Sequence, residues 1–104
     1  MEKYDLYING EASPPASGEY FESFDPYTGK PWARVARGNA QDVERAVQAA
    51  HAAFIAPSWR GLSPSARGAL LRRLADLIAA NAEHLGRIET RDNGKLLAEM
   101  LGQV

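Results

Sequence analysis

The spacing of hydrophobic and polar positions changes once along the chain. Near the amino terminus Tyr4, Leu6 and Ile8 alternate with polar residues, the period of a half-buried strand. Later in the chain, apolar residues recur at every third or fourth position, the period of an amphipathic helix. The pattern predicts an extended region over residues 1–38 and a helical region over residues 39–104.

Turn-forming residues divide the extended region into two predicted hairpins. Asn9-Gly10 is the dipeptide that best tolerates the positive φ angles of a tight hairpin turn. Pro26 and Gly29 suit a type I turn closed by a glycine, between the extended stretches EYFESF and KPWARVAR. Pro31 has no N–H to donate, so it belongs at a strand start or a sheet edge.

The first predicted helix has clear start signals. Asn39 is a good N-cap, and Asp42 places negative charge in the first turn, where the helix dipole favours it. The segment PSWRG, residues 57–61, is expected to end this helix in a loop. The apolar stripe of the helix consists of Val43, Ala46, Val47, Ala50, Ala53 and Phe54.

Two or three further helices are predicted beyond this loop. Ser63 is an N-cap, followed by Pro64 at the first helical position. Asn81 is expected to cap a shorter helix that Gly94 ends as its C′ residue, and a fourth helix begins near Leu96. The stripe expected to be buried on the longer helix consists of Leu70, Leu71, Leu74, Leu77 and Ile78.

Composition and charge exclude several classes of protein. Hydrophobic residues make up 45% and charged residues 24% of the 104 residues, as in ordinary globular domains. Twelve basic residues are interspersed with thirteen acidic ones, which argues against a nucleic-acid partner. No secretory signal and no membrane span is expected, so the sequence is compatible with a cytoplasmic location. The absence of cysteine excludes a disulfide, a thiolate metal site and a cysteine nucleophile in this chain.

No catalytic constellation is found among the remaining residues. His51 and His84 have no partner at metal-ligand spacing, and both are interpreted as surface or boundary histidines. The arginines of RGALLRRLAD either bind an anion or form a solvated helix face. Trp32 and Trp59 either anchor a partner or close the edge of a core. Glycine-rich phosphate turns and the serine nucleophile elbow are absent from the sequence.

Six stretches in order resemble the amino-terminal part of the aldehyde dehydrogenase superfamily. They are an ING hairpin, a DPYTG turn, the DVERAVQAAHAAF helix, a tryptophan, an R-x3-L-x3-ADLI-like helix, and the segment that ends in GK. Together they cover essentially the whole chain. The turn departs from the family at Asp25, where asparagine is common, but an aspartate can make the same local hydrogen bond.

The resemblance implies an α+β fragment of an α/β enzyme, an incomplete domain of N-terminal hairpins and three to four helices. The helices would pack on the dinucleotide-binding domain of the intact protein. The family oxidises aldehydes to carboxylic acids with NAD or NADP, through a cysteine thiolate, and the intact enzyme is expected to be a homo-oligomer. No catalytic or cofactor-binding residue of the family falls on this chain, so the chain alone is expected to be inactive.

One family site does map onto the chain. Many members hold a structural sodium or potassium ion, and the corresponding positions here are Ser23, Phe24 and Asp92. Hard cations of this kind prefer carboxylate and carbonyl oxygens. In the alternative interpretation, Asp92-Asn93-Gly94 is only the polar end of a helix.

Two functions from different classes follow. The first is the N-terminal segment of an NAD(P)-dependent aldehyde dehydrogenase, with the remainder of the enzyme chain as its partner. The second is a free-standing, non-catalytic interaction or oligomerisation module derived from that scaffold. The last residues, LLAEMLGQV, lie inside an amphipathic pattern without a cap, which favours the first. In either case the apolar helix faces predict that the isolated chain self-associates or is only marginally ordered.

Overall fold

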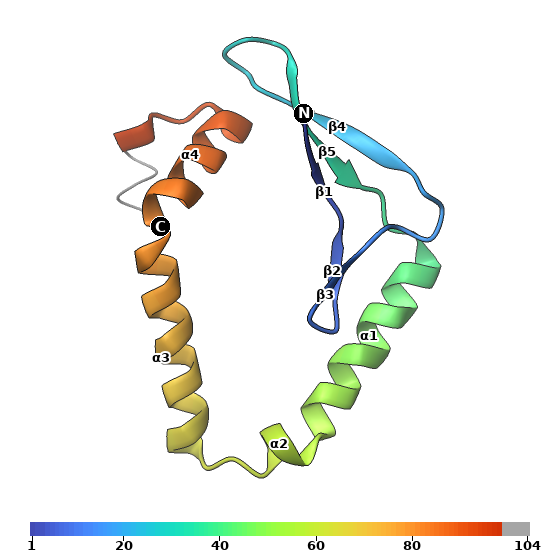
Figure 1. Cartoon of the computed structure of the whole chain (residues 1–104), viewed down its shortest axis with the longest axis vertical. Coiled ribbons are helices and arrows are strands. Elements are labelled where there is room, and N and C mark those ends of the chain that lie inside the picture. Colours follow the sequence, from blue (N-terminus) through green and yellow to red (C-terminus); the bar gives the residue numbers. More distant parts are fainter. Residues whose placement is uncertain (99–104) are drawn as a thin grey trace. The chain divides into compact units, whose positions relative to one another are not determined.

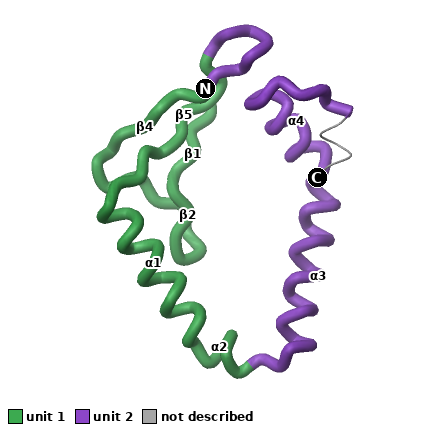
Figure 2. Tube along the Cα trace, turned by 180° about the vertical axis from the view of Figure 1, so that it is seen from behind, with its two compact units in different colours: residues 1–23, 31–61 green, residues 24–30, 62–104 purple. Residues whose placement is uncertain are grey.

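The computed structural model describes residues 1–98, and these fall into two compact units (Figure 2). Among the described residues, unit 1 contains 1–23 and 31–61, and unit 2 contains 24–30 and 62–98. Each unit therefore combines segments that are distant in the sequence. The predicted boundary after residue 38 stays a prediction.

Five short strands form two small sheets (Figure 1). The strands are β1 (Glu2–Tyr4), β2 (Leu6–Ile8), β3 (Glu11–Ser13), β4 (Tyr20–Phe24) and β5 (Pro31–Ala36). One sheet has the order β1-β5-β4, with β1 parallel to β5, and the other pairs β2 antiparallel with β3. Both predicted hairpins are present, and Pro31 begins its strand as expected.

The strand predicted over Tyr4, Leu6 and Ile8 is present as two short strands, because the chain changes sheets at Asp5. The residues before it, in β1, pair with β5, while those after it, in β2, pair with β3. The Asp5 carboxylate accepts a hydrogen bond from the Tyr20 hydroxyl, and this bond raises the pKa of Tyr20. The cations of Lys3 and Arg34 lie over the Tyr20 ring, 5.4 and 5.1 Å from its centroid. Such contacts join residues far apart in sequence, which alternation within one strand does not reveal.

The turn between β2 and β3 has the conformation that its sequence predicts. Asn9 has a φ of 56° and Gly10 a φ of 76°. Positive φ at both central residues defines the type I′ turn, which follows the twist of two paired strands. The register pairs Ile8 with Glu11 directly across the turn.

The small core of unit 1 is centred on β5. Trp32, Ala33 and Ala36 are buried, and the rings of Tyr4 and Trp32 meet edge to face with centroids 6.0 Å apart. Because β5 has a neighbour on each side, its residues are covered where those of the edge strands are not. Trp32 therefore closes a core, as one alternative predicted. Trp59 remains 37% exposed.

Two helices follow in unit 1. Helix α1 (Ala40–Ile55) begins at the predicted N-cap, Asn39. The Asn39 side chain accepts a hydrogen bond from the backbone N–H of Asp42. The loop predicted over residues 57–61 is wrong, because Pro57–Arg60 forms the one-turn helix α2. Proline at the first position suits a helix start, and Gly61 donates its N–H to the carbonyl of Pro57 at 2.9 Å.

Unit 2 carries helix α3 (Pro64–Ala80) and helix α4 (Ala82–Asn93). Ser63 caps α3 as predicted, since its hydroxyl accepts the N–H of Ala66 at 3.1 Å. Asn81 stands at the predicted start of α4, but its side chain makes no cap there and instead donates to the carbonyl of Leu77. Residues 97 and 98 are helical, and the rest of the predicted fourth helix lies outside the described residues.

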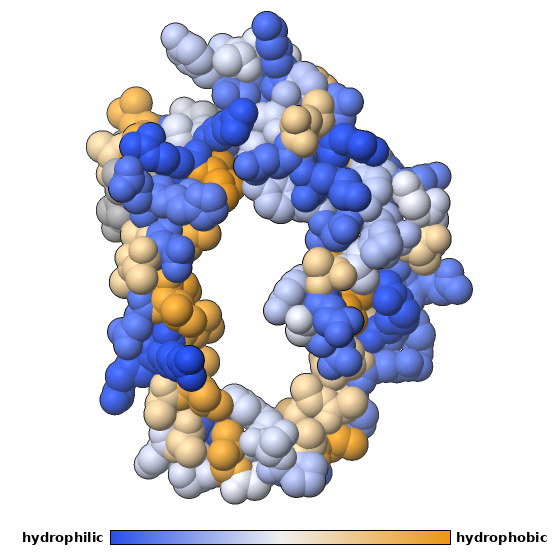
Figure 3. Space-filling view, in the orientation of Figure 1, coloured by the Kyte–Doolittle hydropathy of each residue, from blue (hydrophilic) through white to orange (hydrophobic). Residues whose placement is uncertain are grey.

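The apolar stripes of α1 and α3 are exposed in the described residues. The prediction that the α3 stripe is buried is therefore wrong for this part of the chain. Leu71 is 64% exposed and Val43 60% exposed, and the other large side chains of both stripes are similar. A line of apolar side chains runs along α3 on the visible surface (Figure 3). Amphipathic spacing identifies the face that needs cover, but it does not supply that cover. None of the helices in residues 1–98 has the length and apolarity required to cross a membrane.

Candidate functional site

The turn at residues 25–30 is stabilised by its own hydrogen bonds. The Asp25 carboxylate accepts the N–H of Tyr27 at 2.8 Å, the local bond expected of an aspartate at this position. Gly29, with a φ of 71°, donates its N–H to the carbonyl of Asp25 at 2.8 Å. The closing bond therefore spans five residues and not the four of the predicted type I turn. A second bond, from Asp25 N–H to the carbonyl of Lys30 at 2.9 Å, completes the base of the hairpin.

Gly94 brings this turn into contact with the end of α4. It has a φ of 79° and donates its N–H to the carbonyl of Thr90 at 2.8 Å, which confirms the predicted helix stop. A Cβ atom on Gly94 would lie 2.9 Å from Cγ of Pro26. Only glycine satisfies both the left-handed backbone and this close approach. The DNGK segment therefore requires glycine at position 94, because the turn at residues 25–30 packs against it.

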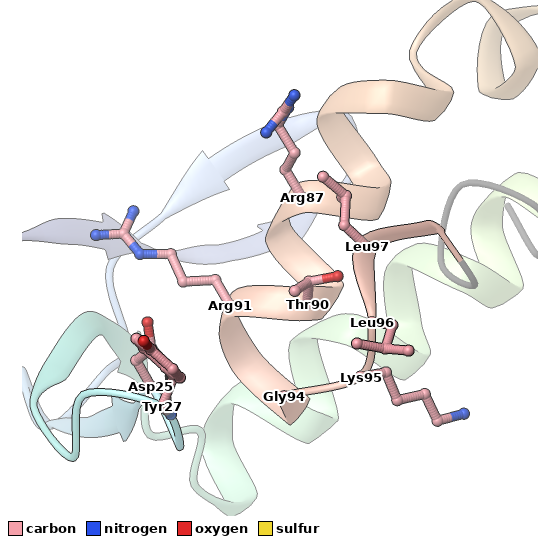
Figure 4. A pocket seen from close by; sticks show the side chains of 9 residues that line it. All are labelled: Asp25, Tyr27, Arg87, Thr90, Arg91, Gly94, Lys95, Leu96 and Leu97. Atoms are coloured by element: carbon pink, nitrogen blue, oxygen red, sulfur yellow. Dashed lines mark hydrogen bonds between the residues drawn. The ribbon is translucent and has the colours of Figure 1, made fainter.

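A pocket of about 440 Å³ lies beside this contact, within unit 2 (Figure 4). Thr90 contributes a buried hydroxyl oxygen that has no hydrogen-bond partner among the described residues. Arg87 forms an ion pair with Glu83 at 2.9 Å, and Lys95 extends away from the other lining side chains. The lining residues are Asp25, Tyr27, Arg87, Thr90, Arg91, Gly94, Lys95, Leu96 and Leu97.

The pocket does not contain the groups that a catalytic site needs. Its lining includes no histidine or cysteine, and its carboxylate, on Asp25, accepts the N–H of Tyr27 within the turn. Apart from Gly94, no sequence pattern predicted this pocket, because its walls come from two segments at least 60 residues apart. The arrangement is a structural junction that leaves a small cavity.

The predicted cation ligands lie on the segments that flank this junction. Phe24 is the last residue of β4 and stands directly before the turn, and Asp92 lies in the last turn of α4, two residues before Gly94. Both are in unit 2, whereas Ser23 belongs to unit 1. Within residues 1–98 no three acidic, histidine or cysteine side chains gather into a metal-binding group. Joint ligation by Ser23, Phe24 and Asp92 stays a prediction.

The other candidates have ordinary surroundings. His51 and His84 are exposed, as the surface interpretation predicted. Arg67, the first arginine of the basic segment, donates to the carbonyl of Leu62 at 2.6 Å and so serves the start of α3.

A buried carboxylate outside the predicted site organises unit 1. Asp42 is only 3% exposed and accepts the N–H of Asn39 at 3.0 Å, which completes a reciprocal capping box. It also accepts the N–H of Ala16 at 3.1 Å and pairs with Arg45 at 3.0 Å. The bond from Asn39, with those from Arg45 and Ala16, holds the pKa of Asp42 below its ordinary value of 3.8.

Sequence reasoning found only part of this arrangement. The spacing of Asn39 and Asp42 carries the capping box, but the contact with Ala16 joins residues 26 positions apart. No local pattern marks that contact. Asp42 is therefore both a helix cap and the anchor of the segment that leads into β4.

Comparison with known proteins places the chain in a family. The model of the aldehyde dehydrogenase family matches residues 13–104. The chain belongs to the aldehyde dehydrogenase family, and the resemblance seen in its sequence is confirmed. Its strands and helices form an α+β segment of this family of α/β enzymes.

Individual relatives show how much of such a protein the chain represents. It is 46% identical over 99 residues to a probable aldehyde dehydrogenase of Streptomyces coelicolor, covering 95% of this chain and 19% of that protein. It is 49% identical over 98 residues to acetaldehyde dehydrogenase 2 of Cupriavidus necator, covering 94% and 19%. An aldehyde dehydrogenase structure from Bacillus cereus matches with a TM-score of 0.93 and 35% identity, covering 97% of this chain and 21% of that one. The chain thus spans about a fifth of the length of these relatives.

Proposed function

We propose that this chain is the N-terminal segment of an NAD(P)-dependent aldehyde dehydrogenase that oxidises an aldehyde to a carboxylic acid. The observation that carries the proposal is the family match over residues 13–104, which spans only about a fifth of each relative. A structural neighbour from Sinorhizobium meliloti is described as NAD-dependent, which supports a nicotinamide cofactor for the whole enzyme. Homo-oligomerisation and a cytoplasmic location belong to the same proposal.

The residues of this chain do not fit the cofactor. The sequence has no glycine-rich phosphate turn, and no two of its nine glycines stand in the G-x-G spacing that such a turn requires. It also has no cysteine, so it cannot form the covalent thiohemiacetal on which this chemistry depends. We therefore assign neither a catalytic nor a cofactor-binding role to any residue here.

The role that the chain can perform is structural. Its helices present apolar stripes, with Leu71 of α3 64% exposed, and we assign their cover to the remainder of the enzyme chain. In that arrangement α1 and α3 pack on the dinucleotide-binding domain. The capped helix starts at Asn39 and Ser63 fix where these faces begin.

A structural sodium or potassium ion is a second element of this role. The donors would be main-chain oxygens of Ser23 and Phe24 and the carboxylate of Asp92, a set of hard ligands that suits a monovalent cation. The support from the structure is that Phe24 and Asp92 both lie next to the segments joined at Pro26 and Gly94. The ion would stabilise this junction and take no part in the oxidation.

The exposed stripes also support the alternative, a free-standing interaction or oligomerisation module. The two proposals differ in the size of the natural product. The mass of the natural gene product distinguishes them, because a product of about 11 kDa, the 11.3 kDa of this chain, would exclude the enzyme segment.

Activity measurements test the enzyme proposal directly. The isolated chain should give no aldehyde-dependent reduction of NAD or NADP, whereas the full-length product that contains it should give such reduction. Calorimetric titration should likewise detect NAD binding only to the full-length product. A full-length product without aldehyde-dependent activity would contradict the proposal, as would reduction by the purified chain above a blank from a mock preparation.

A further inference from the structure

The sequence contains the dipeptide Asn-Gly twice, and the fold places the two copies in opposite environments. Asn9-Gly10 forms the tip of the β2–β3 hairpin, and Asn93-Gly94 forms the end of α4. We propose that Asn9 is a site of spontaneous deamidation and that the fold protects Asn93 from the same reaction.

The chemistry requires only the two residues and water. The main-chain nitrogen of the glycine attacks Cγ of the preceding asparagine, and a C–N bond closes a five-membered imide. The side-chain amide nitrogen leaves as ammonia, taking up the proton that the glycine nitrogen loses. Water then opens the imide at either carbonyl and yields aspartate or isoaspartate. Glycine permits this reaction best because no Cβ obstructs the attack, and asparagine is among the thermolabile residues for this reason.

At the hairpin tip both reacting groups are accessible. Asn9 and Gly10 are exposed, and apart from Gly10 and its two chain neighbours no heavy atom lies within 4 Å of the position that a Cβ on Gly10 would occupy. Within residues 1–98 the Gly10 N–H has no hydrogen-bond acceptor. Ring closure requires Asn9 to rotate out of its turn conformation. Because β2 and β3 have only three residues each, the hairpin opposes this rotation weakly.

At the end of α4 the same two groups are held. The Gly94 N–H, which would supply the attacking nitrogen, is bonded to the carbonyl of Thr90 at 2.8 Å. The Asn93 side-chain oxygen accepts the N–H of Lys95 at 2.9 Å, so the carbonyl that would be attacked is also fixed. Pro26 lies against Gly94 and limits its movement. Reaction here first requires the helix end to open and the turn to move away.

The modification would change the hairpin and leave the helix end intact. Aspartate at position 9 adds one negative charge, which takes the net charge from −1 to −2. Isoaspartate also adds a backbone atom to a two-residue turn that sets the Ile8–Glu11 register. We expect isoaspartate to loosen the pairing of β2 with β3.

The test compares the two sites within one molecule. The purified chain is kept at mildly alkaline pH and 37 °C, cleaved after glutamate, and analysed by mass spectrometry for the gain of about one mass unit. The peptide of residues 3–11 reports Asn9, and the peptide of residues 90–99 reports Asn93. Asn9 should react about tenfold faster than Asn93, or more, in the native chain. Equal native rates, or a faster Asn93, would overturn the proposal.

Two controls separate the fold from the local sequence. In concentrated urea both pairs should react at comparable rates, because unfolding removes the bonds of Gly94 and Asn93. Pro26→Ala, which removes the ring packed against Gly94, should accelerate Asn93 in the native chain and leave Asn9 unchanged. If Asn93 stayed as slow in urea as in the native chain, its protection would belong to neighbouring residues and the inference would fail.

Discussion

The two compact units use different means to order their residues. Unit 1 buries Trp32, Ala33, Ala36 and Asp42, and its Ala16–Asp42 bond joins residues 26 positions apart. In unit 2, α3 has no buried residue, and α4 buries only Gly86 among the described residues. Unit 1 therefore contains part of its own stabilisation. Unit 2 has local caps and the contact at Gly94, and its apolar stripe on α3 stays exposed in the described residues.

The exposed apolar surface of unit 2 is too large for its local caps to compensate. Complete burial of a leucine side chain contributes about 1.5–3 kcal/mol, and Leu71 and Leu74 of α3 are more than half exposed. Caps contribute about 1 kcal/mol each, too little to replace such burial. An amphipathic helix of this kind is stable mainly when another surface covers its stripe.

The largest expected effect is on self-association of the isolated chain. At micromolar concentration the parent should sediment as a dimer or larger species, because another copy can cover the apolar stripes. Replacing Leu71 and Leu74 together by glutamine keeps the helix propensity but removes apolar contact area. The dissociation constant should rise by about tenfold or more, which sedimentation velocity over a concentration series would measure.

A matched double variant on the opposite side of α3 serves as the control. Arg72→Gln with Asp76→Asn leaves the net charge unchanged and, by the helical repeat, alters the face away from the leucines. It should associate like the parent. A parent chain that sediments as a single compact monomer would show that unit 2 needs no further cover.

Sequence reasoning succeeded where the structure is decided by neighbouring residues. The Asn9-Gly10 turn, the caps at Asn39 and Ser63, and the left-handed Gly94 all follow from dihedral preferences and local hydrogen bonds. The family resemblance was also recoverable, because it rests on the order of such local features.

Sequence reasoning failed where the structure depends on contacts between residues that are distant in the sequence or on a competing hydrogen bond. The change of sheets at Asp5 depends on the pairing of β1 with β5, whose paired residues are 31 positions apart. Asn81 was expected to cap α4, but the carbonyl of Leu77 in the preceding turn takes its side-chain amide. The α3 stripe was identified by its period, whereas its burial depends on surfaces absent from residues 1–98.

The next effect in size should arise in unit 1, at Asp42. Asp42→Ala removes the bonds to Asn39, Ala16 and Arg45 together, and leaves two main-chain N–H groups without their acceptor. The melting temperature of unit 1 should fall by roughly 5–15 °C. Both tryptophans lie in unit 1, so fluorescence-detected unfolding reports this unit alone. Glu44→Ala on the same helix loses one exposed bond to Gln48 and should change little.

The contribution of Asp42 should also depend on pH in a defined direction. Its pKa is lower in the folded chain than its ordinary value of 3.8, so the unfolded chain binds the proton more readily. The stabilisation is therefore complete above about pH 5 and is lost as pH falls through the folded pKa. The difference in melting temperature between the parent and Asp42→Asn should shrink in acid, and a difference that grows there would contradict this assignment.

A smaller pair of effects with opposite signs should appear in unit 2. Gly94→Ala forces a Cβ into a left-handed conformation and against Pro26, and should destabilise the end of α4 by about 1–2 kcal/mol. Gly68→Ala, inside α3 with nothing within 4 Å, should stabilise that helix by up to about 1 kcal/mol. Hydrogen exchange of the α4 and α3 amides would measure each change. If Gly94→Ala stabilised α4, as Gly68→Ala should stabilise α3, the close contact of Gly94 with Pro26 would not constrain this position.

The smallest effect is expected at Asp92, and its sign distinguishes the two interpretations of the DNGK segment. If Asp92 is only a polar residue at a helix end, its negative charge faces the negative end of the helix dipole. Asp92→Ala should then be neutral or slightly stabilising, equally in sodium, potassium and choline chloride.

If Asp92 binds a cation with the oxygens of Ser23 and Phe24, the same variant should lower the melting temperature of the full-length protein by a few degrees in sodium or potassium chloride. It should also abolish the difference between these salts and choline chloride. Asp76→Ala controls for general screening of charge in unit 2. Identical unfolding of Asp92→Ala and the parent in all three salts would leave the helix-end interpretation and remove the cation.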